Sequence, residues 1–317
     1  MDTIFDNVPV SDKNRSPSEI FAWMRSIQEA QTTGVLRLLN PPDQKMILHH
    51  YQGNWMNPDL ISSVKSEFSD LADEITQNGE MFLKFIPLST HGLIHANLLA
   101  QAEHGQQEDS FELSNNAPWT FENSGGRTDP YLVKLKWKNA AGSILFNGVS
   151  NQPHSLFISE NLILDELGIS KLIPRQKDDQ SCVVTLFSSD PAVDAWRELR
   201  LRRSFKLLCD CMLERLEMIA GRVILESFTR VIASFTSAEN MDISILKRQL
   251  INNEFYRTSQ EAAVQYRKVL EEFIEHFSSV LGPRLLLMTM REIYNSLSTD
   301  VREDLKFYKI LPEEYLP

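Results

Sequence analysis

The sequence has few of the features that mark secreted or membrane-embedded proteins. Its 317 residues include only three cysteines, an odd number that does not make a disulfide framework. No run approaches the roughly 18 apolar residues of a membrane span, so we expect no membrane insertion. The opening residues, MDTIFDNVPVSDKNR, lack the basic and apolar regions of a secretory signal. These absences predict a cytoplasmic protein.

The motifs of catalysis and phosphate binding are also missing. The segment SGGRT at 124–128 contains two glycines, but it matches neither GxxxxGK[ST] nor GxGxxG. The sequence contains no GxSxG elbow of a hydrolase. We therefore predict no catalytic residues and no cofactor, although an enzyme whose residues are too dispersed to be read from one sequence stays open as an alternative.

Histidine and cysteine do not form a convincing metal site. His91 and His95, in HGLIH, have helical i,i+4 spacing, but a zincin needs Glu directly after the first His and this sequence has Gly. Cys209 and Cys211 diverge by about 200° on a helix. His276 lacks the Glu-X-Arg-Thr-Pro context of a phosphoacceptor histidine. We predict no metal ligands and interpret the cysteines as small packing residues.

The chain changes character near residue 189. Residues 1–188 alternate short β-like runs with helices, and their polar stretch at 104–130 predicts a long loop or insert. Residues 189–317 carry almost only helical signals. The predicted fold class is therefore α+β, with an N-terminal mixed region of short strands and hairpins followed by an all-helical C-terminal region.

Several element boundaries can be predicted from capping and turn residues. Ser16 or Ser18 is a plausible N-cap for a helix in SPSEIFAWMRSIQEA that Gly34 ends, and NPPDQ at 40–44 separates two strands of a hairpin. DLISSVKSEFSDLADEI predicts a further helix and MFLKFIPL a further strand. In the second region, Asp190 is a good N-cap, Thr258 with Glu261 fits a capping box, and Gly282-Pro283 ends a helix.

The stretch from Trp196 to Phe228 predicts one long helix with an apolar stripe. The stripe residues follow one another at helical spacing: Leu201, Phe205, Leu208, Met212, Leu216, Ile219 and Val223. A stripe of this length indicates a buried seam, either within the chain or between subunits. We take it as the predicted surface of self-association, which implies a homo-oligomer.

The opposite side of the same helix is charged. Glu198, Arg202, Lys206, Asp210 and Glu214 succeed one another at i+4, which predicts a solvated face with ion pairs such as Glu198–Arg202.

Three further cations have no obvious local partner: Arg197, Arg200 and Arg203. They are the candidate contacts for an anion or a partner. Nucleic acid is disfavoured as that partner, because the net charge is -11 and no recognisable DNA-binding motif accompanies the cluster.

The N-terminal segment resembles a known signalling module. Residues 16–58, SPSEIFAWMRSIQEAQTTGVLRLLNPPDQKMILHHYQGNWMNP, have a helix, then Thr-Gly-Val-Leu-Arg-Leu, then a hairpin return to an aromatic residue and Gly53. This order is similar to the opening of the bacterial PatA N-terminal type of signalling domain. The resemblance implies a non-enzymatic adaptor or output module, and it carries over no functional residue.

The leading hypothesis is a non-enzymatic regulatory or scaffold protein of bacterial signalling, acting through protein–protein interaction and self-association. The first alternative is a nucleic-acid-binding transcriptional regulator that uses the basic helix at 197–206. The second is the enzyme with a dispersed site.

Overall fold

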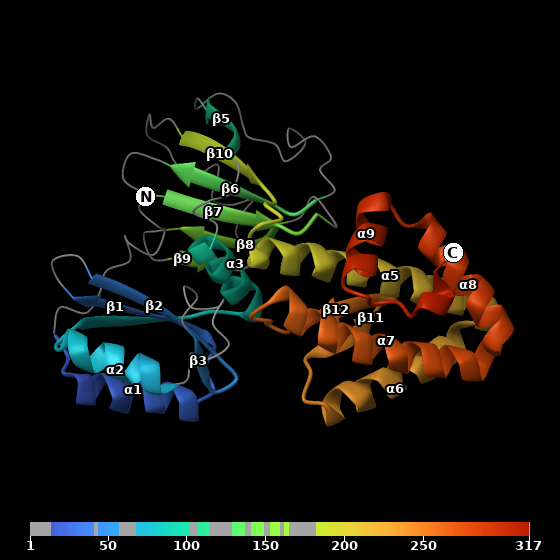
Figure 1. Cartoon of the computed structure of the whole chain (residues 1–317), viewed down its shortest axis with the longest axis horizontal. Coiled ribbons are helices and arrows are strands. Elements are labelled where there is room, and N and C mark those ends of the chain that lie inside the picture. The colour runs from blue at the N-terminus through green and yellow to red at the C-terminus, as the bar shows by residue number, and fades with distance from the viewer. Residues whose placement is uncertain are drawn as a thin grey trace. The chain divides into compact units, whose positions relative to one another are not determined.

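The computed structural model describes residues 14–40, 44–56, 68–101, 107–113, 129–136, 141–148, 153–158, 162–164 and 182–316. The chain forms two compact units, Met1–Ala195 and Trp196–Pro317, called here the N-terminal unit and the helical unit (Figure 1). The predicted α+β class is confirmed: antiparallel sheets come first and a mainly helical region follows.

The first sheet of the N-terminal unit has four antiparallel strands in the order β3-β2-β1-β4. These strands span Asn54–Met56, Gln44–Tyr51, Gly34–Asn40 and Phe82–Pro87. Helices α1 (Pro17–Glu29) and α2 (Phe68–Asn78) cover one face, where Ile20 and Ile75 pack with Leu36 of β1 (Figure 1). The predicted hairpin is β1–β2, paired from Gly34↔His50 to Asn40↔Gln44.

Local capping explains why α1 begins where it does. Ser16 is the N-cap, and its side chain accepts a hydrogen bond from the Glu19 amide. The Glu19 carboxylate accepts in return from the Ser16 amide at 2.9 Å, which completes a capping box. Of the two predicted caps, Ser16 is therefore the one used. The helix predicted from residue 59 is described only from Phe68, as α2, because residues 57–67 lie outside the described ranges.

The second sheet of the N-terminal unit has six antiparallel strands in the order β5-β10-β6-β7-β8-β9. They span Gln107–Leu113, Cys182–Ser188, Tyr131–Lys136, Ala141–Phe146, Pro153–Ile158 and Leu162–Leu164. Helix α3 (Thr90–Gln101) contacts β1 of the first sheet and β8 of the second. Every residue from Gly92 to Leu99 is buried, as expected for a helix covered on all sides.

The helical unit packs around one apolar core. Its helices are α5 (Asp194–Ala220, which begins two residues before the unit), α6 (Arg222–Ala238), α7 (Ser259–Leu281), α8 (Pro283–Ser296) and α9 (Thr299–Phe307), followed by the short helix η7 (Glu313–Tyr315). Gly221, at φ 84°, separates α5 from α6, and Gly282, at φ 78°, separates α7 from α8. Both take a left-handed backbone that favours glycine. The stop predicted at Gly282-Pro283 lies at this second boundary, and Pro283 is the first residue of α8.

Three details of the sequence prediction are corrected. The second region is not all-helical, because β11 (Ile243–Leu246) and β12 (Gln249–Asn252) form an antiparallel hairpin. Strand β5 occupies 107–113, inside the expected loop at 104–130, whose positions 104–106 and 114–128 lie outside the described residues. Asp190 caps a short turn, accepting from the Ala192 amide at 2.8 Å, and the helix itself begins at Asp194.

Within the described ranges, no helix has the length and apolar character needed to cross a bilayer.

Candidate functional site

The β11–β12 hairpin covers the polar face of α5 from Arg202 to Asp210, so this part of the face is not solvated as predicted, whereas Glu214 at its end is exposed. Asp210 accepts a hydrogen bond from the Leu250 amide at 2.7 Å, and Lys206 donates to the Leu250 carbonyl at 3.0 Å. One turn earlier, Arg202 donates to the carbonyl of Asn252 at 3.2 Å. Four helical residues rise about 6 Å and two strand residues about 6.8 Å. The spacing of i,i+4 side chains along α5 is therefore close to the spacing of every second residue along β12. Arg202 can meet Asn252 while Lys206 meets Leu250.

Glu198 and Arg202 form a buried ion pair rather than the exposed pair that the spacing indicated. Their side chains are 4% and 8% exposed, and Arg202 Nε donates to Glu198 Oε1 at 2.9 Å. Arg202 also donates to the Glu254 carbonyl at 2.7 Å and lies over the Tyr256 ring. Burial disfavours the charged guanidinium, but the Glu198 carboxylate together with Tyr266 and Tyr256 more than offsets this and keeps the pKa of Arg202 above its usual value.

The three arginines without local partners do not form an open basic patch. Arg203 is buried and pairs with Asp300 at 2.8 Å, and Arg200 pairs with Asp304 at 3.1 Å. Both aspartates belong to α9, about a hundred positions further along the chain. Arg197 is half-buried on the same helix. The predicted anion contacts are therefore engaged, at least at Arg200 and Arg203, by acidic side chains of the same unit.

The predicted seam is covered within the chain along most of its length. Leu201, Phe205, Leu208, Met212 and Leu216 are each at most 1% exposed and belong to the core of the helical unit. Phe205 stacks on Tyr266 of α7, with ring centroids 4.3 Å apart. The buried part of the stripe ends at Leu216: Ile219, in the last turn of α5, is 44% exposed and Val223 is 78% exposed. Val223 lies beyond Gly221, which breaks the helix that the pattern predicted to be continuous.

The remaining sequence candidates of the helical unit are two cysteines of α5 and a histidine of α7. Cys209 is fully buried and burial raises the pKa of its thiol, while Cys211 is half-buried. The ring of His276 packs on Phe228 at 5.1 Å between centroids. The described residues contain no group of three His, Cys, Asp or Glu side chains arranged to hold a metal.

His95, on α3 of the N-terminal unit, has two side-chain partners that sequence reasoning missed. Its two ring nitrogens lie 2.8 Å from Ser143 Oγ and 2.7 Å from Ser155 Oγ. All three residues are buried, and desolvation lowers the pKa of His95 to about 3. A neutral imidazole needs one donor and one acceptor, and two hydroxyls supply both. Because both ring nitrogens have a buried hydroxyl partner, we interpret the triad as a satisfied core network rather than a catalytic dyad.

Three ion pairs fix the direction in which the α8–α9 segment runs along α5. The pairs are Arg215–Glu292, Arg203–Asp300 and Arg200–Asp304, with N···O distances of 2.9, 2.8 and 3.1 Å. As the residue number falls along α5, the number of its partner rises, so the segment runs antiparallel to α5. If the register of the Arg215–Glu292 pair is extended by one turn along α5 and one turn back along α8, Ile219 is expected at the level of Met288.

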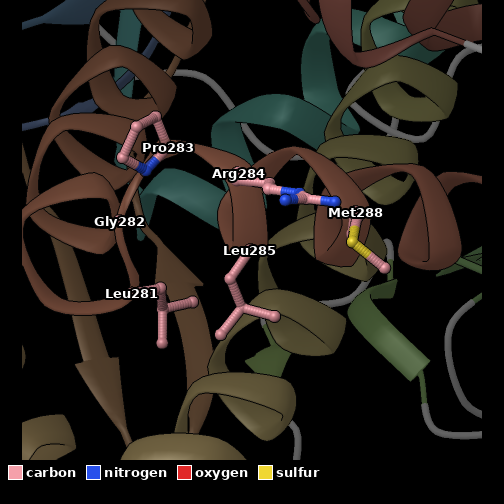
Figure 2. A pocket seen from close by; sticks show the side chains of 6 residues that line it. All are labelled: Leu281, Gly282, Pro283, Arg284, Leu285 and Met288. Atoms are coloured by element: carbon pink, nitrogen blue, oxygen red, sulfur yellow. The ribbon is translucent and has the colours of Figure 1, made fainter.

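Four large apolar side chains are exposed close to the two glycines that separate the helices of this unit. They are Ile219 and Val223, on either side of Gly221, and Leu285 and Met288, at the start of α8, and they are between 42% and 78% exposed; we call this set the apolar corner. Beneath it, Leu216, Leu281 and Leu286 line one small internal cavity. Figure 2 shows that the side chains of Leu281 and Leu285 point to the same side, away from Pro283. The corner is the outward continuation of the buried seam.

The comparisons with known proteins leave the site to be interpreted on its own geometry. No family model, no curated protein and no solved structure matches this chain.

Proposed function

We propose that this protein is a non-enzymatic regulatory adaptor that binds another protein through the apolar corner of its helical unit. The observation that carries the proposal is the corner itself, four large apolar side chains that are exposed on α5, α6 and α8. Exposed apolar patches on a protein with an ordinary content of charged residues mark interaction sites. The helices beneath it are packed in the core of the unit, so the surface is preformed, which lowers the entropy cost of binding.

The pathway assignment rests on the N-terminal resemblance. Residues 16–58 are similar to the bacterial PatA N-terminal type of signalling domain, and the order of α1 followed by the β1–β2 hairpin fits that arrangement. We therefore propose a cytoplasmic role in bacterial signalling. The N-terminal unit would then be the signalling module and the helical unit the partner-binding module.

Nucleic-acid binding has weaker support as the function. Arg200 and Arg203 already pair with Asp304 and Asp300. Each would have to leave an aspartate to meet a phosphate, and the net charge of -11 opposes a polyanion at short range.

The test is recovery of a partner of different sequence from the native cells, with the tagged full chain. Val223→Glu places a carboxylate in the corner at a position that is 78% exposed, so the fold should be kept. The matched control is Leu246→Glu, an apolar residue 60% exposed at the tip of the hairpin. We expect a stoichiometric protein partner that Val223→Glu releases and Leu246→Glu retains. Equal recovery with both variants would contradict the proposal.

A further inference from the structure

The outward face of α8 carries opposite charges on either side of one apolar residue. Arg284, Met288 and Glu292 follow one another at i+4 and are all exposed. Among the described residues Arg284 makes no ion pair. Glu292 pairs with Arg215 through Oε2, which leaves its other oxygen for a second cation. The row Arg284-Met288-Glu292 is therefore positive at one end, apolar in the middle and negative at the other.

We propose that a second copy of this chain binds at the apolar corner, with α8 against the partner's α8 and Met288 at the two-fold axis. This inference rests on one part of the proposed function, the use of the apolar corner as a protein-binding surface, and it names a second copy of the chain as an occupant of that surface. Residues at i and i±4 form a ridge on a helix, and helix pairs that cross at about −50° align these ridges with each other. A two-fold axis at Met288 runs the two ridges in opposite directions. Each Arg284 then lies opposite the partner's Glu292.

The charge pattern selects a second copy over an unrelated partner. A two-fold interface must be self-complementary, since each surface meets an identical one. The row has a cation four residues before Met288 and an anion four residues after it. When two such rows run in opposite directions, each cation meets the partner's anion, so two pairs of opposite charge form. Leu285, Ile219 and Val223 enlarge the contact toward the roughly 800 Å² per partner of a standard interface.

Charge reversal tests this arrangement in the full chain. Arg284→Glu sets two carboxylates opposite each other at both ends of the interface, and Glu292→Arg does the same with two cations. We expect each single variant to raise the dimer dissociation constant at least about tenfold, which is about 1.4 kcal/mol. The double variant Arg284→Glu/Glu292→Arg restores opposite charges across the axis and should recover the wild-type constant to within about threefold. The measurement is sedimentation equilibrium over a concentration series, with Arg230→Glu, an exposed cation of α6, as the control.

Cysteine crosslinking tests the position of the two-fold axis independently of the charge variants. Met288→Cys should form a covalent dimer under mild oxidation, because the axis brings the two copies of residue 288 together. Asn295→Cys is the matched control on the same face of α8. Its two copies would lie about 20 Å apart, at 1.5 Å per residue from the axis, and should not crosslink.

The outcomes separate this inference from the proposed function. A chain that sediments as a 36.4 kDa monomer at every concentration overturns the dimer, and so does a dimer that Arg284→Glu leaves unchanged. Either result leaves the adaptor proposal standing if Val223→Glu still releases a partner of different sequence. A dimer that follows the charge rule, with no such partner recovered, supports the inference and contradicts the adaptor proposal.

Discussion

Replacing Arg202 by Met should destabilise the helical unit strongly, although the side chain lies on what the sequence indicates is a solvated face. The change removes the guanidinium and keeps much of the aliphatic stem. It leaves the Glu198 carboxylate, 4% exposed, without its cation. It also leaves the carbonyls of Asn252 and Glu254 without the donor they share. Breaking a buried ion pair from one side costs about 3–5 kcal/mol, because an uncompensated charge stays buried.

The chain provides a matched control for this prediction. Arg222 and Glu226 form another i,i+4 pair with the same Nε···Oε1 distance of 2.9 Å, but their side chains are 82% and 53% exposed. Arg222→Met should therefore change the free energy of unfolding by no more than about 0.5 kcal/mol. Urea unfolding, monitored by pulsed hydrogen exchange of the α5 and β12 peptides, gives the free energy of unfolding of the helical unit for both variants. A cost below about 1 kcal/mol for Arg202→Met would refute the reasoning that burial determines the value of the pair.

Three other predictions test the packing. Met212→Glu should unfold the helical unit because it buries a lone carboxylate, whereas Val223→Glu should leave the urea midpoint of that unit unchanged. Similar urea midpoints for the two variants would contradict the different burial of the two positions, which lie on opposite sides of the break at Gly221. Burial lowers the pKa of His95 from 6.5 to about 3, so unfolding takes up a proton below pH 6.5 and the N-terminal unit loses stability as pH falls from there toward 3. His95→Gln should reduce that pH dependence by about one proton in urea titrations at stepped pH, and an unchanged slope would contradict it. Cys209→Ala with Cys211→Ala should cost about 1–2 kcal/mol in total, and metal analysis that detects a stoichiometric ion lost in this variant would show a site.

Elements set by local chemistry could be predicted from the sequence. The capping box at Ser16 needs only Glu19 three residues later, and the stop at Gly282 needs only the glycine and Pro283. The α7 start is similar: the Thr258 side chain accepts from the Glu261 amide at 3.1 Å. Each of these signals lies within about four residues, so no knowledge of the fold is required.

The β11–β12 hairpin could not be predicted, because its turn lacks the residues that usually reveal one. Lys247 and Arg248 both have positive φ, 50° and 67°, a conformation that two-residue hairpin turns normally give to Asn or Gly. The strands are four residues each, too short for a clear alternation. What stabilises the hairpin is not local: Lys206 and Asp210 of α5 bind the backbone of Leu250, some forty positions away.

The candidate contacts on α5 illustrate why helix spacing alone does not separate a solvated charge from a buried one. The i,i+4 rule applies equally to Arg202 and Arg222, since it counts only positions on the same helix. Whether water reaches the pair depends on which later segments cover it. The hairpin covers Arg202, whereas Arg222 is 82% exposed.

Partners from another helix do leave a trace in the sequence. Asp300 and Asp304 repeat at i+4, and the cations they bind, Arg203 and Arg200, are spaced at i+3. In this chain, two short charge repeats of opposite sign, each spaced by about one helical turn and far apart in the sequence, therefore indicate a pairing of helices rather than a ligand.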